Sequence, residues 1–428
     1  MKQNINQILK EVLNKINPSK EEIKHIENFL KSFISSFEKK LKAKKIYAQV
    51  FVGGSFAKKT LIKKRLYDID VFVRFEKENK SDEISNLTDK ILHEMKIGKI
   101  SRIHGSRDYF KISGDENFFI ETVPVIKVKN PKEAENITDL SYFHVGYIKK
   151  RLKTEKMLEE VRLAKAFCHA NKCYGAESYI NGFSGYALEL LICHYKSFLN
   201  FIKAATKIKE REIIDIEKLY KNKREIEMNM NGSKMSSPIV LIDPTYKERN
   251  ALAALSNETF RQFQEACRKF LKNPKLENFE EEKINFEKLK EDAKKRKWEF
   301  IFIKAETDKQ EGDIAGSKLV KFYRHLAEEI EKYYEIKNKE FEYNDKKGAE
   351  YIFVVKSRKE IILNGPNAKD EKNVALFENR HKNTFVKKGK IYAREKINEK
   401  INDFIDEWKL KNSEKIREMG ITRLEIVD

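Results

Sequence analysis

Asp68 and Asp70 are the residues of this 428-residue chain whose types and spacing point most directly to chemistry. They stand at the start of an apolar, β-branched run, 69–75, that is typical of a strand. Residues i and i+2 of a strand point to the same face, so the two carboxylates are expected to converge. Carboxylates on one face repel each other unless a cation lies between them. A divalent metal bound to nucleotide phosphates would meet that need.

A Gly-Gly-Ser turn, Gly53-Gly54-Ser55, precedes the two acids by about fifteen residues. Glycine allows the backbone to approach a ligand closely, and the Ser55 hydroxyl with its neighbouring amides can cradle a phosphate. Lys58 follows within one helical turn and could meet the same phosphate. Most turns of this kind are structural, but its place before Asp-x-Asp on an apolar strand favours a nucleotide site.

Glu121 is the best candidate for a third acid, which two-metal chemistry needs in order to activate an attacking hydroxyl. It stands inside the apolar run 118–125, where an unpaired carboxylate is costly. The alternative is a glutamate on the solvent face of an amphipathic strand. Asp115 and Glu116, just upstream, are typical of a turn.

The composition favours a polyanionic partner. The net charge is +20, from 88 Lys and Arg against 68 Asp and Glu. Nucleic acid fits this charge first and an anionic membrane surface second, although a lysine-rich proteome would produce the same excess. No apolar run approaches the ~20 residues of a membrane helix, and 1–16 lacks a signal-peptide pattern. The four cysteines show no Cys-x-x-Cys pairing, so we expect buried free thiols and a cytoplasmic protein.

The pattern of the chain predicts an α+β protein of three parts, 1–147, 148–275 and 276–428. Two helices that Pro18 divides should come first, with Ser19 as an N-cap, then strands and one helix as far as about residue 130. A helical part should follow, with a short strand at 239–244 and a loop at 218–234. The last part should hold strands at 298–303 and 351–355, helices at 315–336 and 394–409, and a turn at 364–366.

The order of these motifs resembles a known family. Gly54-Ser55, then Asp68-Ile69-Asp70, then Glu121 two residues before Val123-Pro124 is similar to the pattern of archaeal-type (class I) CCA-adding enzymes, which are tRNA nucleotidyltransferases. Three later blocks are also similar to that family: 160–167 with 174–177, 182–191, and 243–253. The resemblance extends over nearly the whole chain.

The resemblance implies a fold and an activity. The fold would be a polymerase-beta-like nucleotidyltransferase α/β head, a helical central domain and an α+β C-terminal region with a tail. The enzyme would add C, C and A to the 3′ end of tRNA from CTP and ATP, without a template, releasing pyrophosphate. Asp68, Asp70 and Glu121 would bind Mg²⁺, and Glu121 would orient the primer hydroxyl. Similar enzymes form homodimers.

The resemblance also implies a nucleotide pocket. Lys165 and Tyr174 would contact the triphosphate, although the residues alone favour the alternative for Lys165, a lysine whose stem lies in the core. Arg249 would contact the base, since its planar donor fork suits C and A; the alternative is an arginine paired with Asp243 in a turn. His144 and Ser141 fall where the family has residues near the nucleotide. A structural histidine is the alternative there.

The segment 365–374 resembles the family's tail, which holds the outer elbow of tRNA. Basic residues follow it, with Phe385 and Tyr392 between them, and phosphate contact is the natural role of such a stretch. A solvated run of charge is the alternative. The predicted RNA-binding residues are Arg380, Lys382, Lys387 and Lys388.

The chain departs from the family pattern at Lys58, where arginine is usual, and in the exchanged acid types at Asp68 and Glu121. Lysine keeps the charge but loses bidentate phosphate geometry. Two other classes stay open from the sequence. One is a different nucleotidyltransferase, such as an oligoadenylate synthetase or poly(A) polymerase, and the other is a non-catalytic RNA-binding relative.

Overall fold

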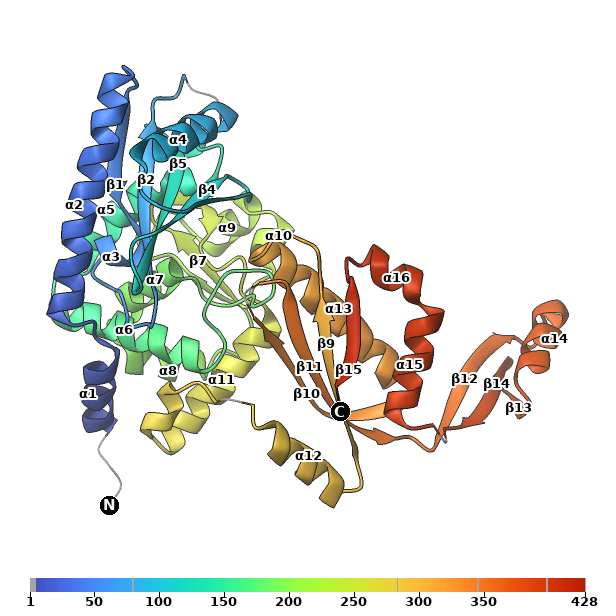
Figure 1. Cartoon of the computed structure of the whole chain (residues 1–428). Helices are drawn as coiled ribbons and strands as arrows, with labels where there is room; N and C mark the ends of the chain where they lie inside the picture. Colours follow the sequence, from blue (N-terminus) through green and yellow to red (C-terminus); the bar gives the residue numbers. More distant parts are fainter. Residues whose placement is uncertain (1–4, 79–80, 283, 345, 398, 428) are drawn as a thin grey trace. The chain divides into compact units, whose positions relative to one another are not determined.

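The computed structural model describes residues 5–78, 81–282, 284–344, 346–397 and 399–427 (Figure 1). The chain divides into two compact units, Met1–Glu282 and Lys283–Asp428. The three-part division drawn from the sequence stays a prediction. In the described part of the chain, no helix is long and apolar enough to cross a membrane.

A five-stranded sheet begins the N-terminal unit, with strand order β1-β2-β5-β4-β3. The strands are β1 (Ala48–Val52), β2 (Tyr67–Phe75), β3 (Ile100–Ile103), β4 (Tyr109–Ser113) and β5 (Phe118–Ile126). The central pair, β2 and β5, is parallel, and the other neighbours are antiparallel. The carboxyl-terminal halves of β2 and β5 are buried almost continuously, as expected for central strands.

Two helices, α2 (Lys20–Ala43) and α4 (Ser81–Met95), pack on one face of this sheet (Figure 1). Apolar residues at helical spacing on α2, among them Leu30, Phe33 and Phe37, enter the same core as the strands. Ser19 caps α2 in a capping box with Glu22, which confirms the predicted N-cap. The first helix, α1 (Ile5–Ile16), packs on α6 instead. The one-turn helix α3 (Gly54–Ala57) follows β1 directly.

The rest of the N-terminal unit is mainly helical, with a small sheet of order β6-β7-β8. Its larger core cluster includes Phe167, Phe183, Phe201 and Phe263, and a smaller one forms where α9, α10 and β7 meet. The elements are α5 (Ser141–Arg151), α6 (Glu155–Ala170), α7 (Gly185–Tyr195), α8 (Phe198–Ala205), β6 (Glu212–Ile214), α9 (Lys223–Asn229), α10 (Gly232–Met235), β7 (Ile239–Asp243), β8 (Tyr246–Asn250) and α11 (Asn257–Lys272), with short 3₁₀ turns at Pro131–Glu133, Ile137–Leu140 and Leu276–Phe279.

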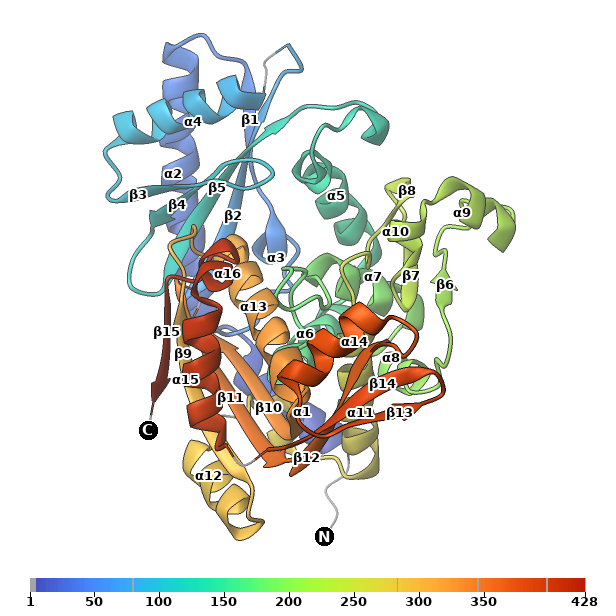
Figure 2. The same ribbon diagram turned by 90° about the vertical axis from the view of Figure 1, so that its right-hand side faces the viewer.

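The C-terminal unit contains two sheets (Figure 2). The first has order β10-β11-β9-β15, and the second has order β12-β14-β13, with α14 packed on β12. The elements are α12 (Phe286–Lys295), β9 (Glu299–Glu306), α13 (Asp313–Glu331), β10 (Tyr334–Tyr343), β11 (Gly348–Ser357), β12 (Glu360–Asn367), α14 (Glu371–Arg380), β13 (Thr384–Lys387), β14 (Lys390–Lys396), α15 (Ile401–Lys411), α16 (Ser413–Glu418) and β15 (Arg423–Val427).

Four expected elements were wrong in part. The loop at 218–234 contains α9 and α10, because Asn222 and Asn231 cap helices there rather than marking a loop. The helix expected at 315–336 ends at Glu331, and β10 begins at Tyr334. The turn at 364–366 lies inside β12 as an irregularity in its register. The helix at 394–409 begins only at Ile401, since residues 390–396 pair between β12 and β13.

Candidate active site

Three carboxylates lie on the two central strands of the first sheet. The parallel register places Asp70 of β2 opposite Glu121 of β5, and Asp68 opposite Phe119. Burial, reinforced by the charge of Asp68, raises the pKa of Asp70 to about 6. Burial raises the pKa of Glu121 to about 7, and the charges of Asp70 and Asp68 add to that rise. The three acids therefore lie within electrostatic reach of one another, as strand alternation predicts for the first two.

The acids do not form a closed set of metal ligands in this conformation. Within the described ranges, no three His, Cys, Asp or Glu side chains are grouped closely enough to hold a metal ion. Asp68 is half exposed, and its Oδ1 accepts from Lys64 Nζ at 3.1 Å. Neither Asp70 nor Glu121 forms an ion pair with any residue that the structure describes. Two half-buried, neighbouring carboxylates without a cation partner fit a divalent metal by charge and by donor type.

Gly54 lies directly against Asp70. Its φ of +56° is in the left-handed region, and a Cβ built there would stand 1.7 Å from Asp70 Oδ2. The Gly53 amide donates to the Asp70 carbonyl oxygen at 2.9 Å. The glycine pair therefore brings the turn onto β2, and it places Ser55, in α3, beside the carboxylates.

Lys58 and Lys165 meet at one buried glutamate. Lys58 Nζ donates to Glu189 Oε2 at 2.6 Å, and Lys165 Nζ donates to Glu189 Oε1 at 3.0 Å. The side chains are 8%, 3% and 0% exposed for Lys58, Lys165 and Glu189. Lys165 therefore holds its charge inside the protein and does not extend to solvent. Burial lowers the pKa of Lys165 to about 8, with the charge of Lys58 acting in the same direction.

Tyr174 lies beside this pair. A Cβ at Gly185, the first residue of α7, would stand 2.8 Å from the Tyr174 hydroxyl and 3.6 Å from Lys165 Nζ. His169, from α6, stacks on the Tyr174 ring with centroids 3.8 Å apart. Burial lowers the pKa of His169 to about 4, so this imidazole is neutral at physiological pH. The predicted triphosphate residues Lys165 and Tyr174 thus lie together.

A second cluster forms around Asp243, at the end of β7. Arg249 Nη1 donates to Asp243 Oδ2 at 2.7 Å, and His144 Nε2 lies 3.1 Å from the same oxygen. Tyr186 donates its hydroxyl to Asp243 Oδ1 at 3.0 Å and stacks on His144 at 4.0 Å. Burial opposes ionisation of Asp243, but the hydrogen bond from His144 and the charge of Arg249 outweigh it and lower the pKa.

Arg249 is therefore paired with Asp243, as the alternative to a base contact predicted. The ion pair with Asp243 fixes the Arg249 guanidinium but leaves it 22% exposed. Its remaining N–H groups are therefore free of Asp243 and can contact the base of the nucleotide. Tyr186 links the two clusters, since Lys58 Nζ and the Arg249 guanidinium each lie 5.8 Å from the centre of its ring. Ser141 is the first residue of α5, one turn before His144.

The predicted RNA-binding residues lie in the C-terminal unit and are all exposed. Arg380 ends α14, Lys382 lies between α14 and β13, Lys387 ends β13, and Lys388 follows in the turn with a φ of +48°.

Sequence analysis missed Glu189, Thr60, Tyr186 and His169, and it gave Asp243 only one of its partners, Arg249. Glu189 carried a usable signal, because it interrupts the apolar helix 187–192 as Glu121 interrupts its strand. A buried acid in a helix predicts a buried cation. Thr60, Tyr186 and His169 gave no such signal, since their roles depend on contacts between distant segments.

Comparison with known proteins gives the family. The nucleotidyltransferase domain family matches residues 31–139, and the family of the second domain of tRNA nucleotidyltransferases matches 159–280. A CCA-adding enzyme of Nanoarchaeum equitans is 38% identical over 315 residues, 74% of each chain. The chain belongs to the CCA-adding enzyme family. A CCA-adding enzyme of Methanocaldococcus jannaschii is 29% identical over 400 residues, 91% of this chain and 86% of that one.

The predicted recognition, enzyme class and fold class are confirmed. The protein is a CCA-adding tRNA nucleotidyltransferase with a polymerase-beta-like head and a second domain. Its substrates are tRNA, CTP and ATP, and its superfamily typically uses a divalent metal ion. The Cid1 poly (U) polymerase shares the fold, with a TM-score of 0.51 and 14% identity over 66% of this chain and all of that one. The oligoadenylate synthetase, poly(A) polymerase and non-catalytic alternatives are set aside.

Replacing Asp70 should stabilise the metal-free protein. Because folding raises the pKa of Asp70, its ionised form destabilises the folded state above pH 6, and this penalty disappears as the pH falls towards the unfolded value near 4. Asp70→Asn should therefore unfold at a higher temperature than the parent in EDTA at pH 8, with a smaller difference at pH 4.5. Glu116→Gln, which removes an exposed acid nearby, serves as the control. An Asp70→Asn protein no more stable than the parent at pH 8 would contradict the uncompensated charge.

Gly54→Ala should reduce CCA addition by displacing the Asp70 carboxylate, in addition to any backbone strain. Gly98→Ala isolates the strain, because Gly98 has a φ of +94° and no heavy atom near its Cβ position. Initial rates of CMP addition, measured beside thermal unfolding, separate the two effects. We expect a rate loss of at least tenfold for Gly54→Ala and little for Gly98→Ala; equal losses would show that the contact with Asp70 is unimportant.

Proposed function

We propose that Asp68, Asp70 and Glu121 are the catalytic residues of CCA addition. In this reaction the 3′-oxygen of tRNA forms a bond to the α-phosphorus of CTP or ATP, the bond to the β-phosphate oxygen breaks, and pyrophosphate leaves. The observation that carries the proposal is the register of β2 and β5, with Asp70 opposite Glu121. It gathers negative charge at one edge of the pocket, where a nucleotide's phosphates could approach only with a cation.

Mg²⁺ is the cofactor that we propose, held by Asp68, Asp70 and Glu121. When bound, it would lower the pKa of the attacking hydroxyl and neutralise charge on the phosphates. Asp68 would have to leave Lys64 in order to join the other two acids. Glu121, on the neighbouring strand, is the acid that we assign to orienting the 3′-hydroxyl.

The triphosphate is the ligand that we propose for Lys58, Lys165, Tyr174 and Ser55. The two buried ammonium groups offer a positive charge that is not fully compensated, and Tyr174 adds a hydroxyl donor beside Lys165. Ammonium groups aimed at phosphates stabilise the charge that develops on pyrophosphate as it leaves.

The base is the ligand that we propose for Arg249, with His144 and Ser141 nearby. Asp243 fixes one edge of the guanidinium, so its remaining donors keep a defined direction towards acceptors on C or A. Tyr186 stacks on His144, bonds to Asp243 and lies 5.8 Å from the Arg249 guanidinium, so it packs beside both residues.

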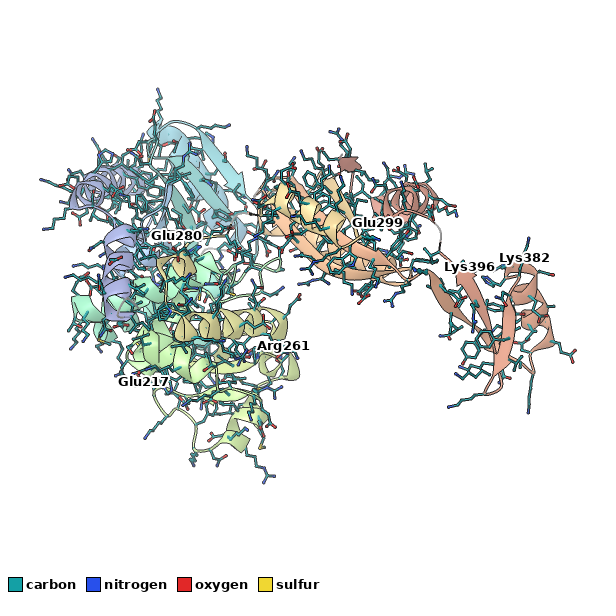
Figure 3. All side chains as sticks on the ribbon, turned by 90° about the horizontal axis from the view of Figure 1, so that it is seen from below. Glu217, Arg261, Glu280, Glu299, Lys382 and Lys396 are labelled. Atoms are coloured by element: carbon teal, nitrogen blue, oxygen red, sulfur yellow. The ribbon has the colours of Figure 1, made fainter. Side chains whose placement is uncertain are left out.

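The tRNA elbow is the partner that we propose for the β12-β14-β13 sheet, shown with its side chains in Figure 3, where Lys382 and Lys396 are labelled. Paired residues of neighbouring antiparallel strands share a face, which places Phe385, Tyr392 and Arg394 together on the face away from Ile391. The other face holds Ile391, against which Phe377 of α14 packs near Gly365.

The open face combines aromatic rings with positive charge. Phe385 and Tyr392 stack with centroids 5.5 Å apart, and the Arg394 guanidinium lies 5.7 Å from the Phe385 ring. Lys387 and Lys390 pair on this face. Rings that can stack on bases, flanked by cations that can contact phosphates, are typical of surfaces that bind unpaired nucleotides.

Three further expectations stay proposals. The four cysteines are free, buried thiols, which supports a reducing compartment such as the cytoplasm. The homodimer follows from the resemblance alone. The division of the chain at residues 147 and 275 follows from the pattern of helices and strands in the sequence.

Asp70→Ala should abolish nucleotide addition without preventing tRNA binding. The reason is that the variant loses one of the proposed metal ligands while the C-terminal unit is unchanged. Incorporation of labelled CMP into tRNA that lacks CCA and the tRNA dissociation constant are the two measurements. Glu116→Gln should retain both. Turnover in Asp70→Ala above one hundredth of the parent rate would contradict the metal assignment.

Tyr392→Ala should weaken tRNA binding, since each stacked base contributes about 1–3 kcal/mol, or roughly five- to 150-fold in affinity. Tyr47→Ala is the matched control, because Tyr47 is an exposed tyrosine of the N-terminal unit. Binding is measured by fluorescence anisotropy at two salt concentrations. Loss of affinity in the Tyr47 variant alone, or in neither, would show that the open face is not the tRNA contact.

A further inference from the structure

The carboxylate of Glu189, in α7, joins three separate segments of the N-terminal unit. Besides Lys58 and Lys165, its Oε1 accepts from the Thr60 hydroxyl at 2.7 Å. Lys165 Nζ in turn donates to Thr60 Oγ1 at 2.8 Å and to the Thr60 carbonyl oxygen at 3.2 Å. Both oxygens of Glu189 are therefore engaged, and each ammonium group is held at a fixed place.

This buried cluster contains two positive charges and one negative charge. A buried excess charge is costly unless an anion approaches it. The Tyr174 hydroxyl also lies beside this cluster: a Cβ at Gly185 would stand 2.8 Å from that hydroxyl and 3.5 Å from Lys165 Cε, so a side chain larger than that of glycine would collide there. The cluster thus has the charge of an anion site, with a hydroxyl donor beside one of its ammonium groups.

We propose that Glu189 is a positioning residue for nucleotide transfer, which holds Lys58 and Lys165 as one pair carrying a single excess positive charge for the triphosphate. This rests on the proposed function, in which these lysines meet the triphosphate. Glu189 does not itself touch the substrate; it acts by fixing both ammonium groups and by keeping that of Lys165 charged. The resemblance leads one to expect arginine at position 58. A lysine there ends in a compact ammonium group, which fits beside the ammonium group of Lys165 on the single carboxylate of Glu189.

The proposal predicts how Lys165 responds to pH. The groups that face it are Glu189 from α7, Lys58 at the end of α3, Lys64 before β2, and His169 and Tyr174 near the end of α6. Glu189 opposes the lowering of the Lys165 pKa by burial, and Lys58 adds to it. Loss of the carboxylate should lower that pKa further, and loss of the Lys58 charge should raise it.

The test measures binding of inorganic tripolyphosphate to the full-length protein by calorimetry, without metal, between pH 6 and 9.5. The variants are Glu189→Gln, Lys58→Met and the double variant. For Glu189→Gln, we expect the pH at which affinity falls to move down by about one unit or more relative to the parent. For Lys58→Met it should move up, and the double variant should lie between. The titration of the probe, Asp70 and Glu121 is common to all four proteins, so only differences between them are compared.

A merely structural Glu189 would lower affinity or melting temperature without moving the pH midpoint, and that result would overturn the proposal. If Glu189→Gln does not fold, Lys58→Met alone tests the proposal. An upward shift of its pH midpoint would support the proposal, and an unchanged midpoint would overturn it. If the parent does not bind tripolyphosphate at any pH, the proposed triphosphate site fails and the role of Glu189 fails with it. Binding by the parent with identical midpoints in all variants would overturn only the role of Glu189.

Discussion

Uncompensated charge inside the N-terminal unit is the constraint on which the account depends. Asp70 and Glu121 face each other on adjacent strands without an ion-pair partner among the described residues, and Lys58 and Lys165 share a single carboxylate. Each arrangement costs folding free energy in the absence of a ligand. A nucleotide triphosphate with its divalent metal carries the opposite charges, positive for the acids and negative for the lysines. In the folded protein without substrate, these carboxylates and one of the two ammonium charges therefore have no opposite charge to balance them.

The fold produces this arrangement by joining segments far apart in the chain. The sheet holds two acids on β2 and one on β5, and the glycine turn after β1 closes against Asp70. The helical part supplies Lys165 and Glu189 from α6 and α7, while the segment 58–60 reaches them from the turn. A third set of contacts, around Asp243, fixes Arg249 and His144. Tyr186 lies between the lysine pair and this set, so its ring connects the two clusters of side chains.

Much of the site was predictable because its signals are local. Strand alternation placed Asp68 and Asp70 on one face, and Glu121 was conspicuous as an acid in an apolar run. The pairing of β2 with β5 was not predictable from these patterns, since parallel strands that are distant in sequence have no local signal for their register. For the same reason the partners of Lys165 were missed. The late start of the helix expected at 394–409 has another cause. Residues 394–400 contain no helix-breaking residue, and only the pairing of β14 with β12 and β13 keeps the first of them in a strand.

We propose that Asp68, Asp70 and Glu121 gather around a divalent metal ion when the nucleotide binds. A crystal of the protein soaked with Mn²⁺ and CTP tests it most directly, because the anomalous scattering of manganese locates the ion independently of the protein. The account predicts an anomalous peak within bonding distance of all three carboxylates, with Asp68 turned away from Lys64. A peak bound elsewhere, or one that Glu121 does not reach while CTP occupies the pocket, would contradict it.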